Sequence, residues 1–163
     1  MSALIDSDAF CKLGGCGLLE AVVRAIGTEL SHTKRLAALP HMLRKGALAR
    51  RVGTLREPLE QLATSLGVAP ETGALWLDRI LTNAPDVDVG EAQLFALAAE
   101  HSDVLLITGD KRAVEAIGRV WDSTKLGRAY VKRPLLRPLM DGGCDRASAR
   151  QPLTAPSVSP VTM

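Results

Sequence analysis

The stretch 102-SDVLLITGDKRAVEA-116 passes from apolar to charged residues within a few positions. Val104 to Ile107 form an apolar run typical of a buried strand, and the segment from about 111 to 119 is expected to form a helix. Asp110 lies between the two. It either caps that helix or belongs to a site at the edge of a sheet, and the rest of the chain must decide which.

Apolar runs and helical periodicity alternate along the chain. A very short apolar run at 3–5 ends at Asp6, and residues 17–27 repeat apolar side chains at helical spacing. Asp88 followed by Glu91 predicts a capping box at the start of a helix that is apolar nearly all round. The other predicted helices span about 40–51, 54–67 and 72–81. Together these elements predict an α/β fold, a three-layer α/β/α domain with a central parallel sheet of four or five strands.

The composition fits one soluble domain, with 163 residues, 47% hydrophobic and 23% charged, and a formal net charge of +2. We expect this domain to span residues 1–139, with an edge strand at 129–133. Residues 140–163 are rich in Gly, Ser, Thr and Pro, and are expected to form a disordered tail. No apolar run approaches the roughly 20 residues that cross a bilayer. Because an Asp at position 6 also argues against a signal peptide, we expect a cytoplasmic protein with no membrane contact.

Three acidic residues are placed where a parallel sheet would bring them together. Asp6 and Asp110 follow predicted strands, and Glu91 lies in the first turn of the buried helix. The carboxyl ends of parallel strands lie at one edge, where carboxylates repel each other unless a cation neutralises them. Oxygen-only ligands suit Mg²⁺ or Mn²⁺. The structural alternative makes Asp6 and Asp110 helix N-caps and Glu91 the acid of a capping box, and spacing alone leaves both interpretations open.

Three blocks of sequence, in this order, resemble the PIN-domain nucleases: 4-LIDSDAF-10, 90-GEAQLFALAAE-100 and 105-LLITGDKRA-113. That family has a strand followed by Asp and a small hydroxyl residue, then Gly-Glu-Ala before an Ala-rich helix. Its next block is an apolar strand followed by Thr, one residue and Asp. The matching residues here are Asp6-Ser7, Gly90-Glu91-Ala92 and Thr108-Gly109-Asp110. The resemblance covers residues 3 to 118 and implies that Asp6, Glu91 and Asp110 are the catalytic and metal-binding residues.

One position departs from the family pattern. The family usually places a Glu on the helix after its second strand, typically before a Leu-Arg pair. The corresponding segment, 39-LPHMLRKGALARR-51, contains no acidic residue, and Met42 stands at the expected position. The metal site is therefore expected to be weaker than one with a complete set of four acids. Asp8 and Asp86 are the candidates to replace the missing acid.

The resemblance implies a Mg²⁺- or Mn²⁺-dependent endoribonuclease, in which water acidified by the cation attacks an RNA phosphodiester bond. PIN-like proteins of this size often pair with a small partner protein, many as the toxin of a toxin–antitoxin pair, and often form homodimers. The candidates for holding the RNA backbone are Arg44, Lys45, Arg50 and Arg51, although such a basic run is usually just a solvated face. Aromatic residues make up only 3% of the chain, which argues against recognition by base stacking.

Two other functions compete with the nuclease. The opening Leu-Ile-Asp-Ser-Asp also resembles the haloacid-dehalogenase-type phosphatases, in which Asp6 would take the phosphoryl group and Asp8 would be the general acid. That family expects an acid four residues after a Gly-Asp pair, where this chain has Val114. The second alternative is a catalytically degenerate PIN-like module that binds RNA or protein. The missing fourth acid and the basic segment both favour it.

Overall fold

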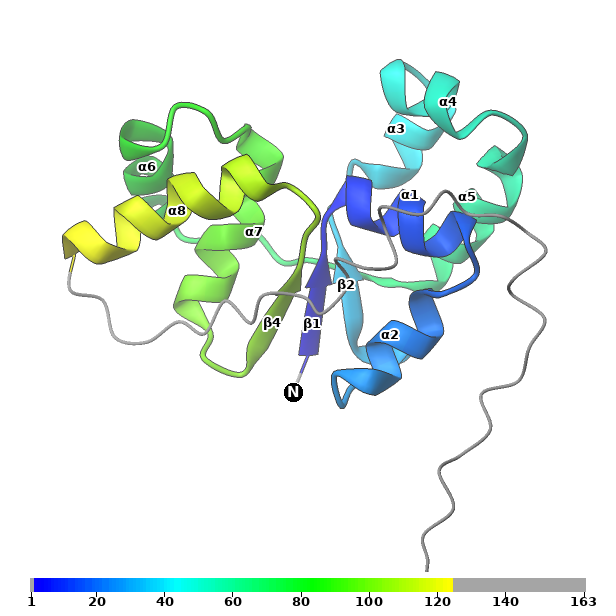
Figure 1. The fold of residues 1–163 in the computed structure, drawn as a ribbon, viewed down its shortest axis with the longest axis horizontal. Coiled ribbons are helices and arrows are strands. Elements are labelled where there is room, and N and C mark those ends of the chain that lie inside the picture. Colours follow the sequence, from blue (N-terminus) through cyan, green and yellow to red (C-terminus); the bar gives the residue numbers. More distant parts are fainter. Residues whose placement is uncertain (1, 125–163) are drawn as a thin grey trace, which may run out of the picture.

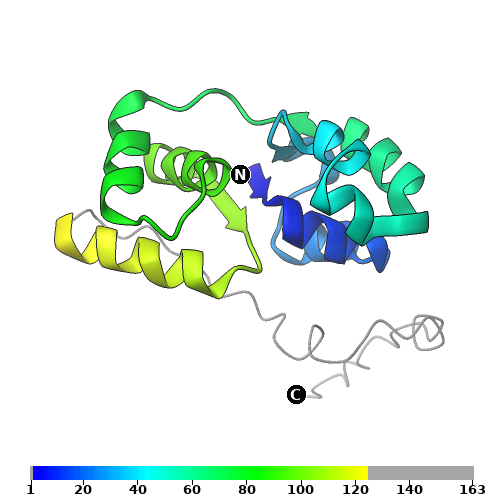
Figure 2. The same ribbon diagram turned by 90° about the horizontal axis from the view of Figure 1, so that it is seen from above.

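The computed structural model describes residues 2–124, which form a four-stranded parallel sheet with helices on both faces (Figure 1, Figure 2). The strands are β1 (Ser2–Ile5), β2 (Thr33–Arg35), β3 (Gly67–Val68) and β4 (Val104–Ile107), in the order β3-β2-β1-β4. Each neighbouring pair is parallel. The predicted α/β fold with a central parallel sheet of four strands is thus confirmed. The predicted edge strand at 129–133, the domain limit at 139 and the tail lie outside the described residues.

Eight α-helices connect and cover these strands within the described range. The prediction of a single helix over about 40–51 was wrong. Two helices, α3 (Leu39–Arg44) and α4 (Ala47–Val52), occupy this segment, because Gly46 interrupts it with a left-handed φ of 89°. No helix among residues 2–124 is long and apolar enough to cross a membrane. The helices are α1 (Ser7–Gly15), α2 (Leu19–Ala25), α3 (Leu39–Arg44), α4 (Ala47–Val52), α5 (Arg56–Ser65), α6 (Ala74–Asn83), α7 (Val89–Glu100) and α8 (Lys111–Thr124).

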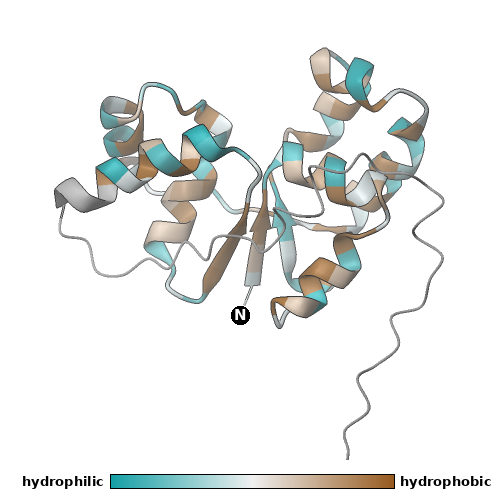
Figure 3. Ribbon diagram, viewed as in Figure 1, coloured by the Kyte–Doolittle hydropathy of each residue, from teal (hydrophilic) through white to brown (hydrophobic). Residues whose placement is uncertain are grey.

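Side chains of the central strand alternate between the two faces of the sheet, as the strand period requires. Ala3 and Ile5 pack with α1, α2, α3 and α5, whereas Leu4 belongs to a second cluster with α7. Behind α7, the helices α6 and α8 close a third cluster that includes the fully buried Ile80 and Ile117. Burial of each such aliphatic side chain stabilises the fold by about 1.5–3 kcal/mol. The resulting hydrophobic centre around β1 and β4 is visible in Figure 3.

The order of the strands reverses between β1 and β4. From β1 the sheet grows to β2 and β3 on one side, while β4 pairs with its other side. Open parallel sheets bind ligands at such a reversal, in the crevice outside the carboxyl ends of the strands. Asp6 directly follows β1, and Thr108, Gly109 and Asp110 directly follow β4. The topology therefore brings two of the predicted site residues to the edge where a ligand is expected.

Candidate functional site

Asp6 connects the end of β1 with the turn that follows β4. Its side chain is buried, with only 6% of the residue exposed. Oδ1 accepts a hydrogen bond from the backbone N–H of Ala9 at 2.7 Å, which makes Asp6 the N-cap of α1. Oδ2 accepts a second from the N–H of Gly109 at 3.2 Å, and the Thr108 hydroxyl also bonds to the carboxylate. Asp6 is thus a helix cap on one side and a link to the turn after β4 on the other.

Asp110 caps the next helix in the same way. Its Oδ1 accepts hydrogen bonds from the N–H groups of Arg112 at 2.8 Å and Ala113 at 3.2 Å. Its Oδ2 lies 3.2 Å from the guanidinium of Arg112. The N–H of Asp110 donates to the Thr108 hydroxyl at 3.2 Å, so that Thr108 contacts both Asp6 and Asp110. The predicted helix-cap role of Asp110 is therefore confirmed together with its place at the carboxyl edge.

Glu91 forms the predicted capping box. Its N–H donates to Asp88 Oδ1 at 2.8 Å, and its Oε2 accepts from the N–H of Asp88 at 3.1 Å. The start of α7 lies against the end of β2, because a Cβ added to Gly90 would be only 3.0 Å from Leu36 Cδ1. A side chain at position 90 would require Leu36 to shift.

The three carboxylates interact electrostatically. Burial raises the pKa of Glu91, and the charges of Asp88, Asp110 and Asp6 raise it further. Burial likewise raises the pKa of Asp6 despite its three hydrogen bonds. For Asp110 burial also acts to raise the pKa, but the hydrogen bonds from Ala113 and Arg112 outweigh it, and the pKa lies below the ordinary value. All three acids thus cap or open helices, and the charges of Asp6 and Asp110 act on Glu91.

This donor set fits Mg²⁺ or Mn²⁺ by its chemistry. All three side chains offer oxygen, and each carboxylate has about four lone-pair sites, of which the helix caps use only some. In the arrangement described for residues 2–124, no three His, Cys, Asp or Glu side chains are already grouped so that they could hold a metal ion. Binding would require the carboxylates to turn toward one another while their backbone positions remain fixed by the caps.

The position of the missing fourth acid lies next to Asp6. The sulfur of Met42, in α3, is 4.0 Å from the hydroxyl oxygen of Ser7. Of the two candidate replacements, Asp8 is close, because its Oδ2 would be 3.5 Å from a Cβ placed on Gly109. Its oxygens are bound by Lys12 at 2.6 Å and by Arg51 at 2.8 Å. Asp86 has a side chain that is 72% exposed and pairs at 4.0 Å with Arg119 of α8.

The four predicted RNA-binding cations are separated by the fold. Arg51 reaches Asp8 at the site, whereas Arg44 pairs with Glu60 of α5 at 3.3 Å. Lys45 and Arg50 are exposed. The sequence analysis missed Lys12, although its position four residues after Asp8 on one helix was a usable signal for an ion pair.

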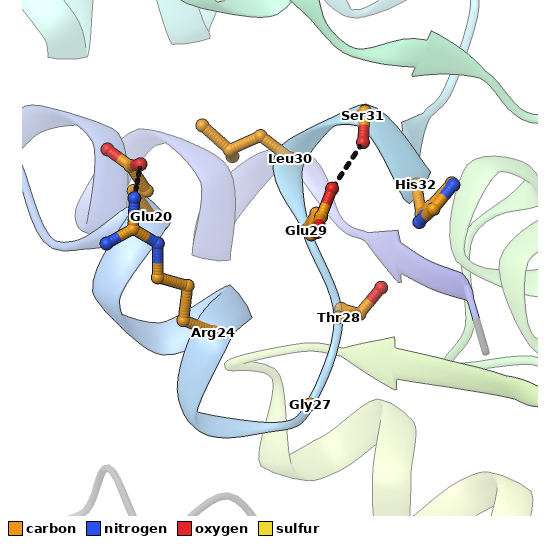
Figure 4. A pocket seen from close by; sticks show the side chains of 8 residues that line it. All are labelled: Glu20, Arg24, Gly27, Thr28, Glu29, Leu30, Ser31 and His32. Carbon is orange, nitrogen blue, oxygen red and sulfur yellow. Dashed lines mark hydrogen bonds and ion pairs between the residues drawn. The ribbon is translucent and has the colours of Figure 1, made fainter.

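One hollow of the described structure lies away from the acids. It has a volume of about 650 Å³ and lies beside the end of α2 and the start of β2, at the amino edge of the sheet (Figure 4). Charged groups of its lining are already engaged with each other, since Arg24 pairs with Glu20 and Glu29 accepts a hydrogen bond from Ser31. None of the predicted catalytic residues contributes to its lining. We therefore place the functional site at the carboxyl edge.

Comparison of the chain with models of protein families, with curated proteins and with solved structures finds no match. Any function of this chain must therefore be inferred from the spacing of its residues and from the positions that the fold gives them.

The opposite pKa shifts of Asp6 and Asp110 predict opposite effects of pH on stability. The pKa of Asp6 lies above its ordinary 3.8, so its contribution to folding is greatest below that pH and is lost as the pH rises through the folded-state pKa. Asp6→Asn keeps an N-capping side chain but carries no charge. As the pH rises from about 4 to about 7, we expect the free energy of unfolding of this variant to rise relative to that of the unsubstituted protein. Urea unfolding with a chelator present measures this difference.

Asp110→Asn provides the matched control. The pKa of Asp110 lies below 3.8, so its stabilising contribution is present above that pH and is lost as the pH falls. Asp110→Asn should therefore be less stable, relative to the unsubstituted protein, at about pH 7 than at about pH 4. The same pH trend in both variants would contradict the electrostatics described here.

Proposed function

We propose that this protein is a Mg²⁺- or Mn²⁺-dependent ribonuclease of the PIN-like type, which hydrolyses internal phosphodiester bonds of an RNA strand. The observation that supports it most strongly is that Asp6 and Asp110 follow β1 and β4 at the strand-order reversal of the sheet, with Glu91 near enough that their charges raise its pKa. An acidic cluster at this edge fits a cation and a phosphate better than it fits a neutral ligand. The resemblance of three ordered sequence blocks to the PIN-domain nucleases supports the same proposal.

Each residue of the site would have a defined task. Asp6, Glu91 and Asp110 would hold the cation, which when bound would neutralise phosphate charge and lower the pKa of a water molecule. Asp6 accepts hydrogen bonds from α1 and from the turn after β4, which fix its place between the two. The Thr108 hydroxyl accepts a hydrogen bond from the backbone N–H of Asp110 and lowers the pKa of Asp6. From the same resemblance we propose that the substrate is RNA and that this protein is the toxin of a pair, with a small antitoxin-like protein as its partner. We also propose that it self-associates as a homodimer.

A second candidate is a degenerate PIN-like module that binds RNA or a protein without cutting it. Met42 favours this alternative, because it places a thioether beside Ser7 where the family has a carboxylate. A thioether is a poor ligand for Mg²⁺, which prefers hard oxygen donors. The two candidates differ in whether the three remaining acids support turnover.

The acids can be tested individually. We expect the purified protein to cleave a mixed RNA substrate in the presence of Mn²⁺ and to lose this activity with a chelator. Asp6→Asn and Asp110→Asn should each reduce the cleavage rate by about 100-fold or more, because each removes a charged metal ligand. Asp78→Asn, which changes an exposed acid on α6, should retain the rate of the unsubstituted protein. Equal residual cleavage in all four proteins would indicate a contaminating nuclease and would remove the proposal.

Met42→Glu tests the missing acid directly. Met42 is exposed beside Ser7, so a Glu can be accommodated without creating a cavity or a buried charge. We expect the Mn²⁺ concentration for half-maximal cleavage to fall on the order of tenfold, because affinity rises with the number of charged ligands. Met42→Gln is the matched control, with nearly the same shape and no charge. If Glu and Gln behaved alike, position 42 would not be the position of the fourth acid.

A further inference from the structure

Asp8 joins two cations that come from different helices. Lys12 Nζ lies 2.6 Å from Asp8 Oδ2 and is one turn further along α1. Arg51 Nη2, from α4, lies 2.8 Å from Asp8 Oδ1. One carboxylate therefore holds an ammonium and a guanidinium side by side, although their residues are far apart in sequence.

This cluster lies at the rim of the acidic site. A Cβ added to Gly109 would be 3.5 Å from Asp8 Oδ2 and 3.8 Å from Lys12 Nζ. The N–H of the same Gly109 donates to Asp6 Oδ2 at 3.2 Å. The charge of Asp8 also acts on the pKa of Asp6. Lys12 and Asp6, the residue that follows β1, thus both lie beside Gly109 in the turn after β4.

The two cations remain accessible to a ligand. The side chain of Lys12 is 48% exposed and that of Arg51 is 57% exposed. An ammonium has three N–H donors and a guanidinium five, so that the contact with Asp8 leaves most of them free to bind other acceptors. Ion pairs this exposed contribute little to folding stability, so stability alone does not account for the arrangement.

We propose that Lys12 and Arg51 form a phosphate clamp that holds the RNA backbone beside the acidic residues. This proposal rests on the proposed ribonuclease function and identifies the residues that attach its substrate. A site of three carboxylates repels a polyanion, whereas two fixed cations at its rim attract one and determine where it lies. Of the neighbouring cations, Arg112 binds Asp110 and Arg44 binds Glu60 of α5, so that neither belongs to the cluster around Asp8.

RNA binding across a series of salt concentrations tests the clamp. A fluorescently labelled single-stranded RNA oligonucleotide is titrated with protein, with a chelator present to prevent cleavage, and anisotropy gives the affinity. Each phosphate contact that is lost should reduce the slope of log affinity against log salt by about 0.7. We expect this reduction in Lys12→Ala and in Arg51→Ala, with weaker binding to RNA of any sequence. Lys12→Arg, which keeps the charge, should retain the slope.

Arg24→Ala is the matched control. Arg24 forms the same kind of exposed pair, four residues after its acid Glu20, but on α2 near the amino edge of the sheet. It should bind RNA with the slope of the unsubstituted protein. Equal slopes in all variants, or no salt-dependent binding by the unsubstituted protein, would overturn the clamp.

The clamp and the nuclease fail in different ways. If cleavage depends on Asp6 but Lys12→Ala and Arg51→Ala leave the salt dependence of RNA binding unchanged, the clamp proposal is wrong and the ribonuclease proposal stands. Slopes that depend on Lys12 and Arg51, without cleavage that depends on Asp6, support the clamp and assign this protein to the binding modules.

Discussion

The buried carboxylate of Asp6 holds the centre of this structure together. A carboxylate taken out of water destabilises the fold unless hydrogen bonds replace its hydration, and Asp6 receives them from Ala9, Thr108 and Gly109. Hydrogen bonds to a charged group contribute about 1.5–3 kcal/mol each. They fix the start of α1 and the turn after β4 relative to each other. The backbone pairing of β1 with β4, up to Ile5 and Ile107, sets the separation of the two strand ends.

Helix capping and ligand binding are not alternatives in this fold. α1, α7 and α8 all begin at the carboxyl edge, and an acid that faces this edge occupies the first turn or the cap of each. The positive ends of the helix dipoles favour carboxylates there, which reduces the repulsion among them. The same backbone amides then hold the acids in place for a cation. Burial is the main cause of the raised pKa of Glu91, and the charges of Asp88, Asp110 and Asp6 add to it, as expected for a site that a cation would stabilise.

The elements that carry this site could be predicted from sequence because their signals are local. β4 is a continuous apolar run, and the capping box of Asp88 and Glu91 forms as its spacing indicates. β2 and β3 gave no signal, since they have only three and two residues and β2 carries Lys34 and Arg35. They are strands because β1 offers a parallel neighbour, which is information that the local sequence lacks.

The helix α1 was not predicted from the sequence. Two glycines at its end weaken the helical pattern, and burial of Phe10 compensates for them in the folded structure. The helix predicted from about residue 54 begins slightly later, since α5 starts after Leu55, without a side-chain cap. Partners that lie far apart in sequence, such as Asp8 and Arg51, could not be predicted at all.

The central claim is that Asp6, Glu91 and Asp110 form one cation site, and anomalous scattering from crystals soaked in Mn²⁺ tests it most directly. Mn²⁺ prefers the same oxygen ligands as Mg²⁺ and scatters anomalously, so that its position can be located without assumptions about activity. The account predicts an anomalous peak bounded by the three carboxylates, with metal–oxygen distances of about 2.1 Å. A saturated crystal in which this edge of the sheet carries no peak would contradict it.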